Sequence, residues 1–143
     1  MQISINANRC EPSPMRKFHP LAVAAKKEGK KIYHLNIGQP DLPTPPAYYE
    51  AVHKFADRTL EYEASPGRPE LINAVKNYYK ELKVDLDDND ILITTGGSEA
   101  LLFTCLSILD PYTEVIIPEP YYPNYTTFVH AAGGVIRALP TNP

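Results

Sequence analysis

The chain has few cysteines, no excess of positive charge and no long hydrophobic run. Its 143 residues include two cysteines, Cys10 and Cys105, which form no Cys-x-x-Cys motif. Cys105 falls within an apolar helical pattern, so we expect a reduced thiol in the core of a cytoplasmic protein. The apolar stretches are too short to cross a membrane. The first residues show no basic region leading into an apolar core, so we expect no secretory signal.

The charge balance argues against two classes of partner. A formal net charge of −3 and a pI near 5.8 favour neither nucleic acid nor an anionic membrane surface. The single histidines, such as His34 and His53, and the acidic run 87–90 are interpreted as packing residues and a solvated turn. We therefore assign no metal site. The fifteen prolines cluster around 40–46 and 118–123, which predicts two rigid loops.

Hydrophobic periodicity predicts an alternating α/β chain. Residues 1–13 are expected to be irregular because Pro12 and Pro14 oppose a continuous helix. The expected helices cover 20–29, 47 to about 58, 69–82, 98–109 and 124–132, and the expected strands cover 31–36, 91–94, 114–117 and 135–139. From residue 90 onward this is a βαβαβ order with nearly continuous apolar strands, which is typical of a parallel sheet covered on both faces. The helix at 98–109 is apolar on most sides, so we expect it to be deeply buried.

The segment 91–102 carries the most specific chemical signal. A short apolar run ends at Gly96, Gly97 and Ser98, and an apolar helix follows. The free backbone N–H groups at a helix N-terminus bind anions, phosphate above all. The glycines would let the backbone approach a ligand, and Ser98 could cap the helix and add a hydroxyl donor. An ordinary strand–turn–helix connection fits the same residues, so both interpretations stay open at this point.

Four sequence blocks in register make a family resemblance specific. They are 35–41 (Leu-Asn-Ile-Gly-Gln-Pro-Asp) with Thr44-Pro45, Tyr62 with Gly67 and 69–71, 95–100 (Thr-Gly-Gly-Ser-Glu-Ala), and 114–118 with 120–125 (Pro-Tyr-Tyr-Pro-Asn-Tyr). Together they resemble the N-terminal third of a class I/II aminotransferase, a fold-type-I enzyme that uses pyridoxal 5'-phosphate. The resemblance covers roughly residues 15–140. One departure, Leu71-Ile72-Asn73 where the family often has Leu-Arg, affects a helix-surface position.

The resemblance implies cofactor-binding roles for residues on two segments. Gly97, Ser98 and Glu99 would present backbone N–H groups to the cofactor phosphate, and Ser98 would add its hydroxyl. For the Glu99 side chain, a solvated carboxylate is an equally good interpretation, so only its backbone is assigned. Tyr122 would stack on the pyridine ring, held still by the flanking prolines. The alternative for Tyr122 is a tyrosine packed in a proline-rich loop.

Two further residues receive roles from the resemblance. Gly38 would bring its N–H to the substrate carboxylate, where a side chain would collide with the substrate. Its alternative is a simple turn glycine. Tyr62 would cross a dimer interface and donate a hydrogen bond to the cofactor phosphate of the partner subunit. Its alternative is a core tyrosine at a helix end.

The chemistry of this family needs a lysine that holds the cofactor as a Schiff base, and the chain has no lysine after Lys83. We therefore expect an N-terminal piece that is inactive alone. Its expected parts are an arm and small-domain segment (1–45) and the beginning of a large cofactor domain (46–143) with a mostly parallel, helix-covered sheet. The parent would be a homodimer that moves an amino group between an amino acid and a 2-oxo acid. The alternatives are a C–S lyase or synthase of the same fold and a non-catalytic phosphate-binding α/β module.

Overall fold

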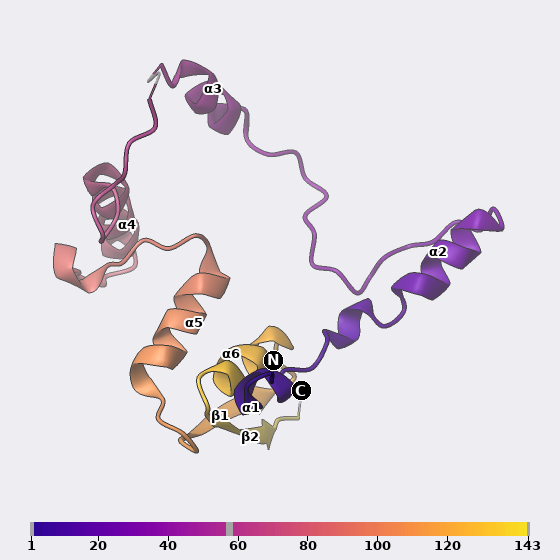
Figure 1. Ribbon diagram of the computed structural model, residues 1–143. Helices are drawn as coiled ribbons and strands as arrows, with labels where there is room; N and C mark the ends of the chain where they lie inside the picture. Colours follow the sequence, from indigo (N-terminus) through magenta and orange to yellow (C-terminus); the bar gives the residue numbers. More distant parts are fainter. Residues whose placement is uncertain (1, 57–58, 143) are drawn as a thin grey trace.

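The computed structural model describes residues 2–56 and 59–142, and the chain follows an open path. From the N-terminus it runs outward through α2 and α3, turns at α4 and returns through α5 to a small sheet (Figure 1). The N-terminal helix α1 lies beside α6, so the first and the last elements of the chain belong to the same part of the molecule (Figure 1). The part of the chain that the structure describes has no helix long and apolar enough to cross a membrane.

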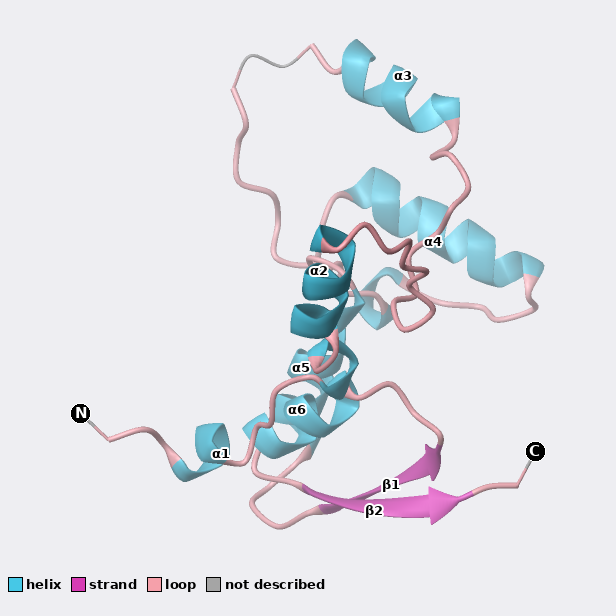
Figure 2. Ribbon diagram, turned by 90° about the vertical axis from the view of Figure 1, so that its right-hand side faces the viewer, coloured by secondary structure: helices cyan, strands magenta, loops and turns pink. Residues whose placement is uncertain are grey.

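The C-terminal part forms a compact β–α–β unit. Strand β1 (Glu114–Glu119) pairs in parallel with β2 (Val135–Pro140), in a register that places Glu114 opposite Val135. Helix α6 (Asn124–Ala131) connects the strands and lies over one side of the pair (Figure 2). Val129 of α6 is only 3% exposed. The expected parallel pairing of these two strands is confirmed.

A tight helix end makes this connection short. Gly133 has a φ of +88°, and its N–H donates to the carbonyl of His130 (3.0 Å), while the N–H of Gly134 donates to Val129 (2.9 Å). This pair of hydrogen bonds is the Schellman arrangement, in which glycine takes the left-handed position without steric cost. A Cβ on Gly134 would lie 2.9 Å from the Val129 side chain. The close packing of α6 on β2 therefore requires glycine at this position.

Two of the expected strands, 31–36 and 91–94, do not form in the described chain. Residues 31–36 and 91–94 carry the predicted apolar residues, yet neither segment forms a ladder with another described segment. The Ile93 N–H instead donates to the carbonyl of Pro66 at 2.9 Å. A strand exists only through hydrogen bonds to a neighbour, and the described residues offer no neighbour to these two segments. The prediction of a βαβαβ sheet holds for its second half only.

The predicted helices are present with small shifts at their ends. Helix α2 spans His19–Lys27, α3 spans Pro46–Lys54, α4 spans Pro69–Glu81 and α5 spans Gly97–Ile108. The first three begin with proline at one of their first two positions, where its missing N–H costs nothing. The predicted end of α3 near Arg58 falls on a residue outside the described ones, and the helix stops before it, at Lys54. Three short helical turns were not predicted: α1 (Ile5–Asn8), η1 (Pro14–Arg16) and η2 (Asp88–Asp90).

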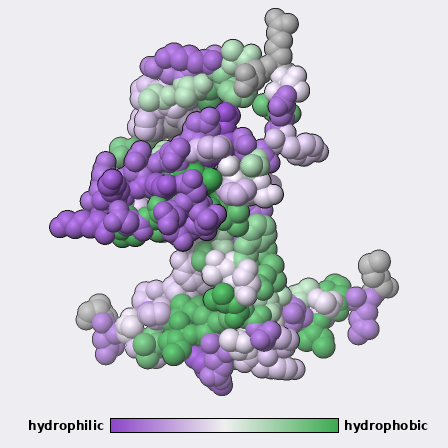
Figure 3. Space-filling model, turned by 90° about the vertical axis from the view of Figure 1, so that its left-hand side faces the viewer, coloured by the Kyte–Doolittle hydropathy of each residue, from purple (hydrophilic) through white to green (hydrophobic). Residues whose placement is uncertain are grey.

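The prediction that the helix at 98–109 is deeply buried is wrong for this chain. None of the residues of α5 is buried, and Ile108 is 69% exposed. In the space-filling view, hydrophobic side chains gather on the lower part of the face that carries α5 (Figure 3). Ile72 and Val129 are the only buried hydrophobic residues among those described. Helix α5 contacts α6, but this contact leaves every residue of α5 at least partly exposed.

Candidate functional site

The first turn of α5 forms a preorganised donor surface. Gly96 precedes the helix with φ +87° and ψ 169° and is its N-cap, without a side-chain cap. The carboxylate of Glu99 folds back and accepts the N–H of Thr95 at 2.5 Å, and the Thr94 hydroxyl donates to the carbonyl of Gly96 at 3.0 Å. The N–H groups of the first helical residues have no acceptor within a helix. The local bonds therefore fix the turn and leave these N–H groups for a ligand.

Ser98 does not cap α5, contrary to the sequence interpretation. The helix begins at Gly97, and Ser98 is already its second residue. A residue at that position has helical backbone angles, so its side chain cannot take the reach-back geometry of an N-cap. Ser98 is exposed. As an exposed residue of the first turn, Ser98 can offer its hydroxyl to the same ligand as the N–H groups of that turn.

Gly97 has no structural reason to be glycine within the described chain. Its φ is not in the left-handed region, and a Cβ at Gly97 would meet no atom within 4 Å. Glycine within a helix costs roughly 0.5–1 kcal/mol relative to alanine. Close approach of a ligand to the backbone would account for this glycine. Gly96, by contrast, needs glycine for its positive φ alone.

Tyr122 lies in the proline-rich loop between β1 and α6 and is 46% exposed. Its ring meets the ring of Tyr125 edge to face at 5.8 Å, and its hydroxyl accepts a hydrogen bond from the Asn124 side-chain amide at 3.0 Å. Tyr121 stacks on Tyr125 at 6.4 Å. Tyr122 is thus held by Tyr125 and Asn124, and nearly half of the residue's surface remains accessible.

Gly38 and Tyr62 lie on the connections on either side of α3. Gly38 is exposed, and a Cβ there would meet no atom within 4 Å. Tyr62 is fully exposed and lines an open pocket of about 620 Å³ together with Phe55 and Arg68. The core-tyrosine alternative for Tyr62 is therefore not supported in this chain. No described pocket brings Gly38 or Tyr62 together with Gly97 or Tyr122.

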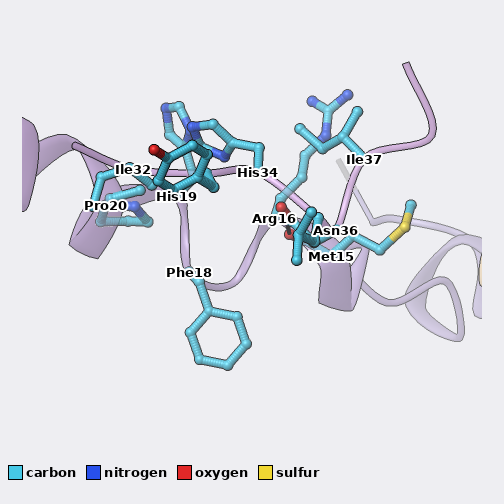
Figure 4. A pocket seen from close by; sticks show the side chains of 12 residues that line it. Met15, Arg16, Phe18, His19, Pro20, Ile32, His34, Asn36 and Ile37 are labelled. Atoms are coloured by element: carbon cyan, nitrogen blue, oxygen red, sulfur yellow. Dashed lines mark hydrogen bonds between the residues drawn. The ribbon is translucent and has the colours of Figure 1, made fainter. Parts of the chain in front are cut away.

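A pocket beside α2 was not predicted from the sequence. It has a volume of about 860 Å³ and is formed by α2, the turn before it and the extended segment 32–37 (Figure 4). The Asn36 side-chain amide donates to the carbonyl of Met15 at 2.7 Å and ties the two segments together. Gly38 follows this pocket directly in the sequence. The sequence predicts a strand over 31–36, and that interpretation of Ile32 and Leu35 concealed this arrangement.

Other titratable groups add little chemistry. Both cysteines are free, and burial raises the pKa of the Cys105 thiol, so this thiol is a poor nucleophile. Across the strand pair, a hydrogen bond from the Arg137 guanidinium lowers the pKa of the Glu114 carboxyl. Within residues 2–56 and 59–142 no group of three or more His, Cys, Asp or Glu is placed to hold a metal ion.

Comparison with known families identifies the class of protein. Residues 30–143 match the family model for aminotransferase class I and II. The chain therefore belongs to the class I and II aminotransferases, a family of transferases with the type I fold that uses pyridoxal phosphate.

Individual relatives make the relationship more specific. A (5-formylfuran-3-yl)methyl phosphate transaminase of Methanocaldococcus jannaschii is 38% identical over 115 residues, which are 79% of this chain and 31% of that protein. The aspartate aminotransferase of Rhizobium meliloti is 35% identical over 126 residues, which are 85% of this chain and 30% of that protein. The chain thus spans about a third of the length of the relatives that it matches.

A solved structure shows that the open path is a family feature. A double mutant of Thermus thermophilus aspartate aminotransferase superposes on all of this chain with a TM-score of 0.92 at 30% identity, using 38% of its own length. The mixed α/β arrangement with its small parallel sheet is therefore part of the aspartate aminotransferase fold.

Proposed function

We propose that this chain is the N-terminal part of a pyridoxal-phosphate-dependent aminotransferase that moves an amino group between an amino acid and a 2-oxo acid. Residues 1–45 would belong to an arm and the small domain, and residues 46–143 to the beginning of the large cofactor domain. Family membership and coverage of about a third of each relative support this proposal. The strongest structural support comes from the first turn of α5. There, Gly97 has no packing role within the described chain, and the N–H groups have no acceptor within the helix.

In this proposal the first turn of α5 holds the cofactor phosphate. The backbone N–H groups of Gly97, Ser98 and Glu99 would donate to phosphate oxygens, and the Ser98 hydroxyl would add a further donor. The helix dipole favours a negative charge at this end. The bond from Thr95 to the Glu99 carboxylate keeps that negative group folded against the backbone. The helix dipole and the unpartnered N–H groups thus both favour an anion at this turn.

The remaining site residues would orient the ring and the substrate. Tyr122 offers a partly exposed aromatic face for offset stacking. The Gly38 N–H would bind the substrate carboxylate at a position where the chain leaves open space. Tyr62, exposed and without a covering segment in its own described chain, would reach the phosphate in a partner subunit. Bound pyridoxal phosphate supplies an electron sink that makes the proton on the substrate α-carbon acidic.

The decisive experiment compares this chain with the full-length protein. Purified full-length protein should absorb visible light because a lysine outside these residues binds the cofactor covalently. The 143-residue chain should not, because Lys83 is its last lysine and no lysine follows the phosphate-binding turn. Borohydride reduction followed by mass spectrometry measures the trapped cofactor. Stoichiometric trapping on the short chain would disprove the proposal that it is an inactive portion.

The same preparation tests the type of reaction. A transaminase would convert a 2-oxo acid into its amino acid in step with loss of the amino donor. A C–S lyase of the same fold would release a thiol or sulfide and ammonia from a sulfur-containing amino acid instead. Quantifying both amino-acid products and ammonia by chromatography decides between the two.

A further inference from the structure

The segment 6–10, called the latch here, crosses the end of α6 and is bonded to it at several points. The Arg9 guanidinium donates to the carbonyl of Gly134 at 3.0 Å, while the carbonyl of Arg9 lies 3.0 Å from His130 Nδ1. The Asn6 side-chain amide donates to the carbonyl of Ala131 at 3.3 Å. Because a carbonyl can only accept, His130 must carry a proton on Nδ1. Arg9 is thus held at both its side chain and its main chain.

The latch is attached to the best-packed part of the molecule. Gly133 and Gly134 are buried, and Val129 beside them is only 3% exposed. The acceptors Ala131 and Gly134 lie at the C-terminal end of α6, where the helix dipole favours a cation such as Arg9. Figure 1 shows α1, which contains most of the latch, beside α6 and the strands. The latch therefore fixes the N-terminal segment to a rigid support.

The position of the latch decides where the next residues lie. Directly after it, residues 11–14 face the end of β1, the following loop and the first turn of α6 (119–127) across a pocket of about 400 Å³. Tyr121 and Pro123, the two neighbours of Tyr122, are among the residues that line this pocket. The lining residue Ser13 has a buried hydroxyl oxygen without a hydrogen-bond partner in the described chain. Residues 11–14 are thus one wall of a polar pocket that adjoins the proposed cofactor-stacking tyrosine.

We propose that Arg9 and His130 are positioning residues that hold this wall in place and thereby shape the pocket beside the Tyr122 loop, through which the substrate would contact the Tyr122 site. The inference rests on the proposed function for the identity of that site. It goes beyond it because neither residue touches the proposed cofactor or substrate. With the latch released, residues 11–14 lose their attachment to α6, and the pocket loses one wall while the sheet and the α5 turn stay intact.

The test uses the full-length protein and four variants. His130→Phe removes the donor to the Arg9 carbonyl and keeps an aromatic ring, and Arg9→Met removes the guanidinium. His130→Asn retains an N–H donor near the Nδ1 position and should restore the bond. Lys17→Met is the control, because it removes a nearby exposed cation that makes no hydrogen bond or ion pair to the latch. Hydrogen exchange is measured on peptides that cover residues 6–17 and 119–127, with and without cofactor.

We expect His130→Phe and Arg9→Met to speed exchange in residues 6–17 by about tenfold or more, since each removes an anchoring bond. His130→Asn and Lys17→Met should exchange like the wild type. With 2-oxoglutarate and whichever of L-aspartate or L-alanine the protein turns over, the two disruptive variants should raise KM severalfold and leave kcat within about twofold. Exchange in residues 94–102, at the α5 turn, should not change.

Two results would overturn the inference. Unchanged exchange in residues 6–17 would mean that Arg9 and His130 do not hold the segment. Faster exchange throughout the protein, together with a lower melting temperature, would mean that they merely stabilise the fold. Hydrogen exchange of residues 6–17 can be measured on cofactor-free protein even if no transamination is found. Absence of transamination would therefore contradict the proposed function, and unchanged exchange would contradict the role of Arg9 and His130.

Discussion

The β1–α6–β2 unit and the open stretch from α2 to α5 contrast within one chain. In the unit, Val129, Gly133 and Gly134 are buried, and the latch adds bonds from residues far away in sequence. In the open stretch, Ile72 on α4 is the only buried hydrophobic residue among those described. Helix α5 has none, although it is more apolar than α4. Hydrophobic composition therefore does not distinguish the packed part from the open part.

What separates the two regions is the availability of partners. Strand β2 follows β1 after one short helix, so the unit completes its contacts within about 27 residues, 114–140. Helix α5 contacts α6, yet none of its residues is buried, and the segments 31–36 and 91–94 form no strand pair with another described segment. Because the chain matches a third of a complete aminotransferase with a TM-score of 0.92, we propose that the missing partners belong to the other two thirds.

The largest expected effect concerns the packed unit. In the 143-residue chain, Val129→Ala should destabilise α6 and β2 by about 2–3 kcal/mol, because it removes two buried methyl groups and leaves a cavity. Val52→Ala on α3, where the residue is 55% exposed, should cost less than about 0.5 kcal/mol. Urea-dependent hydrogen exchange of the α6, β2 and α3 amides measures both. Equal losses would remove the contrast between the regions.

A second prediction tests whether an exposed residue of the open stretch is functional. In the full-length protein, Tyr62→Phe should weaken cofactor binding by about 1.5–3 kcal/mol, the range for a hydrogen bond to a charged group. The melting temperature of the cofactor-free protein should hardly change, because Tyr62 is fully exposed and its ring is retained. Equilibrium dialysis with pyridoxal phosphate gives the dissociation constant.

Mixed dimers test whether Tyr62 acts across an interface. A Tyr62→Phe subunit is paired with one whose own phosphate site is destroyed by Gly97→Asp. The intact phosphate site belongs to the Tyr62→Phe subunit. If Tyr62 acts in trans, the Gly97→Asp subunit supplies a wild-type Tyr62 to this site, and its cofactor affinity should be near normal. A weak site in this mixed dimer would place any role of Tyr62 within its own subunit and disprove the interface proposal.

Tyr122 belongs to the border of the packed unit and should give a smaller effect. Tyr122→Ala in the full-length protein should loosen cofactor binding by about 1–2 kcal/mol, since a stacking contact and some burial are lost. Tyr122→Phe keeps the ring and removes only the hydroxyl that accepts from Asn124, so it should bind the cofactor nearly as well as wild type. An unchanged dissociation constant for Tyr122→Ala would leave Tyr122 as a packing residue.

The smallest effect concerns the end of α4. Lys83 has a φ of +62°, and it closes a Schellman turn in which its N–H donates to Lys80 and that of Val84 to Tyr79. Lys83→Gly should stabilise the protein by about 0.5–1 kcal/mol, because glycine takes this conformation without a Cβ penalty. Lys80→Gly, within the helix, should have the opposite sign and a similar size. Chemical denaturation measures both, and a destabilising Lys83→Gly would contradict the assignment.

Local sequence signals predicted much of this structure. The helices were found because their apolar spacing, proline starts and glycine ends act within a few residues, as at Gly29, whose φ is +81°. The parallel pairing of 114–119 with 135–140 was found for the same reason, since both strands are apolar and one helix joins them. The family was predicted from motifs whose residue types have a local chemical role, such as the glycines before α5.

The sequence determined the helices, the β–α–β unit and the family, because these depend on neighbouring residues. Tertiary structure alone decided which apolar segments are buried and that residues 31–36 and 91–94 form no strands among the described residues. It also placed the latch on α6, through bonds between residues more than 120 positions apart. Burial, strand pairing and such long-range bonds each need a second surface, and no local pattern in the sequence specifies where that surface lies.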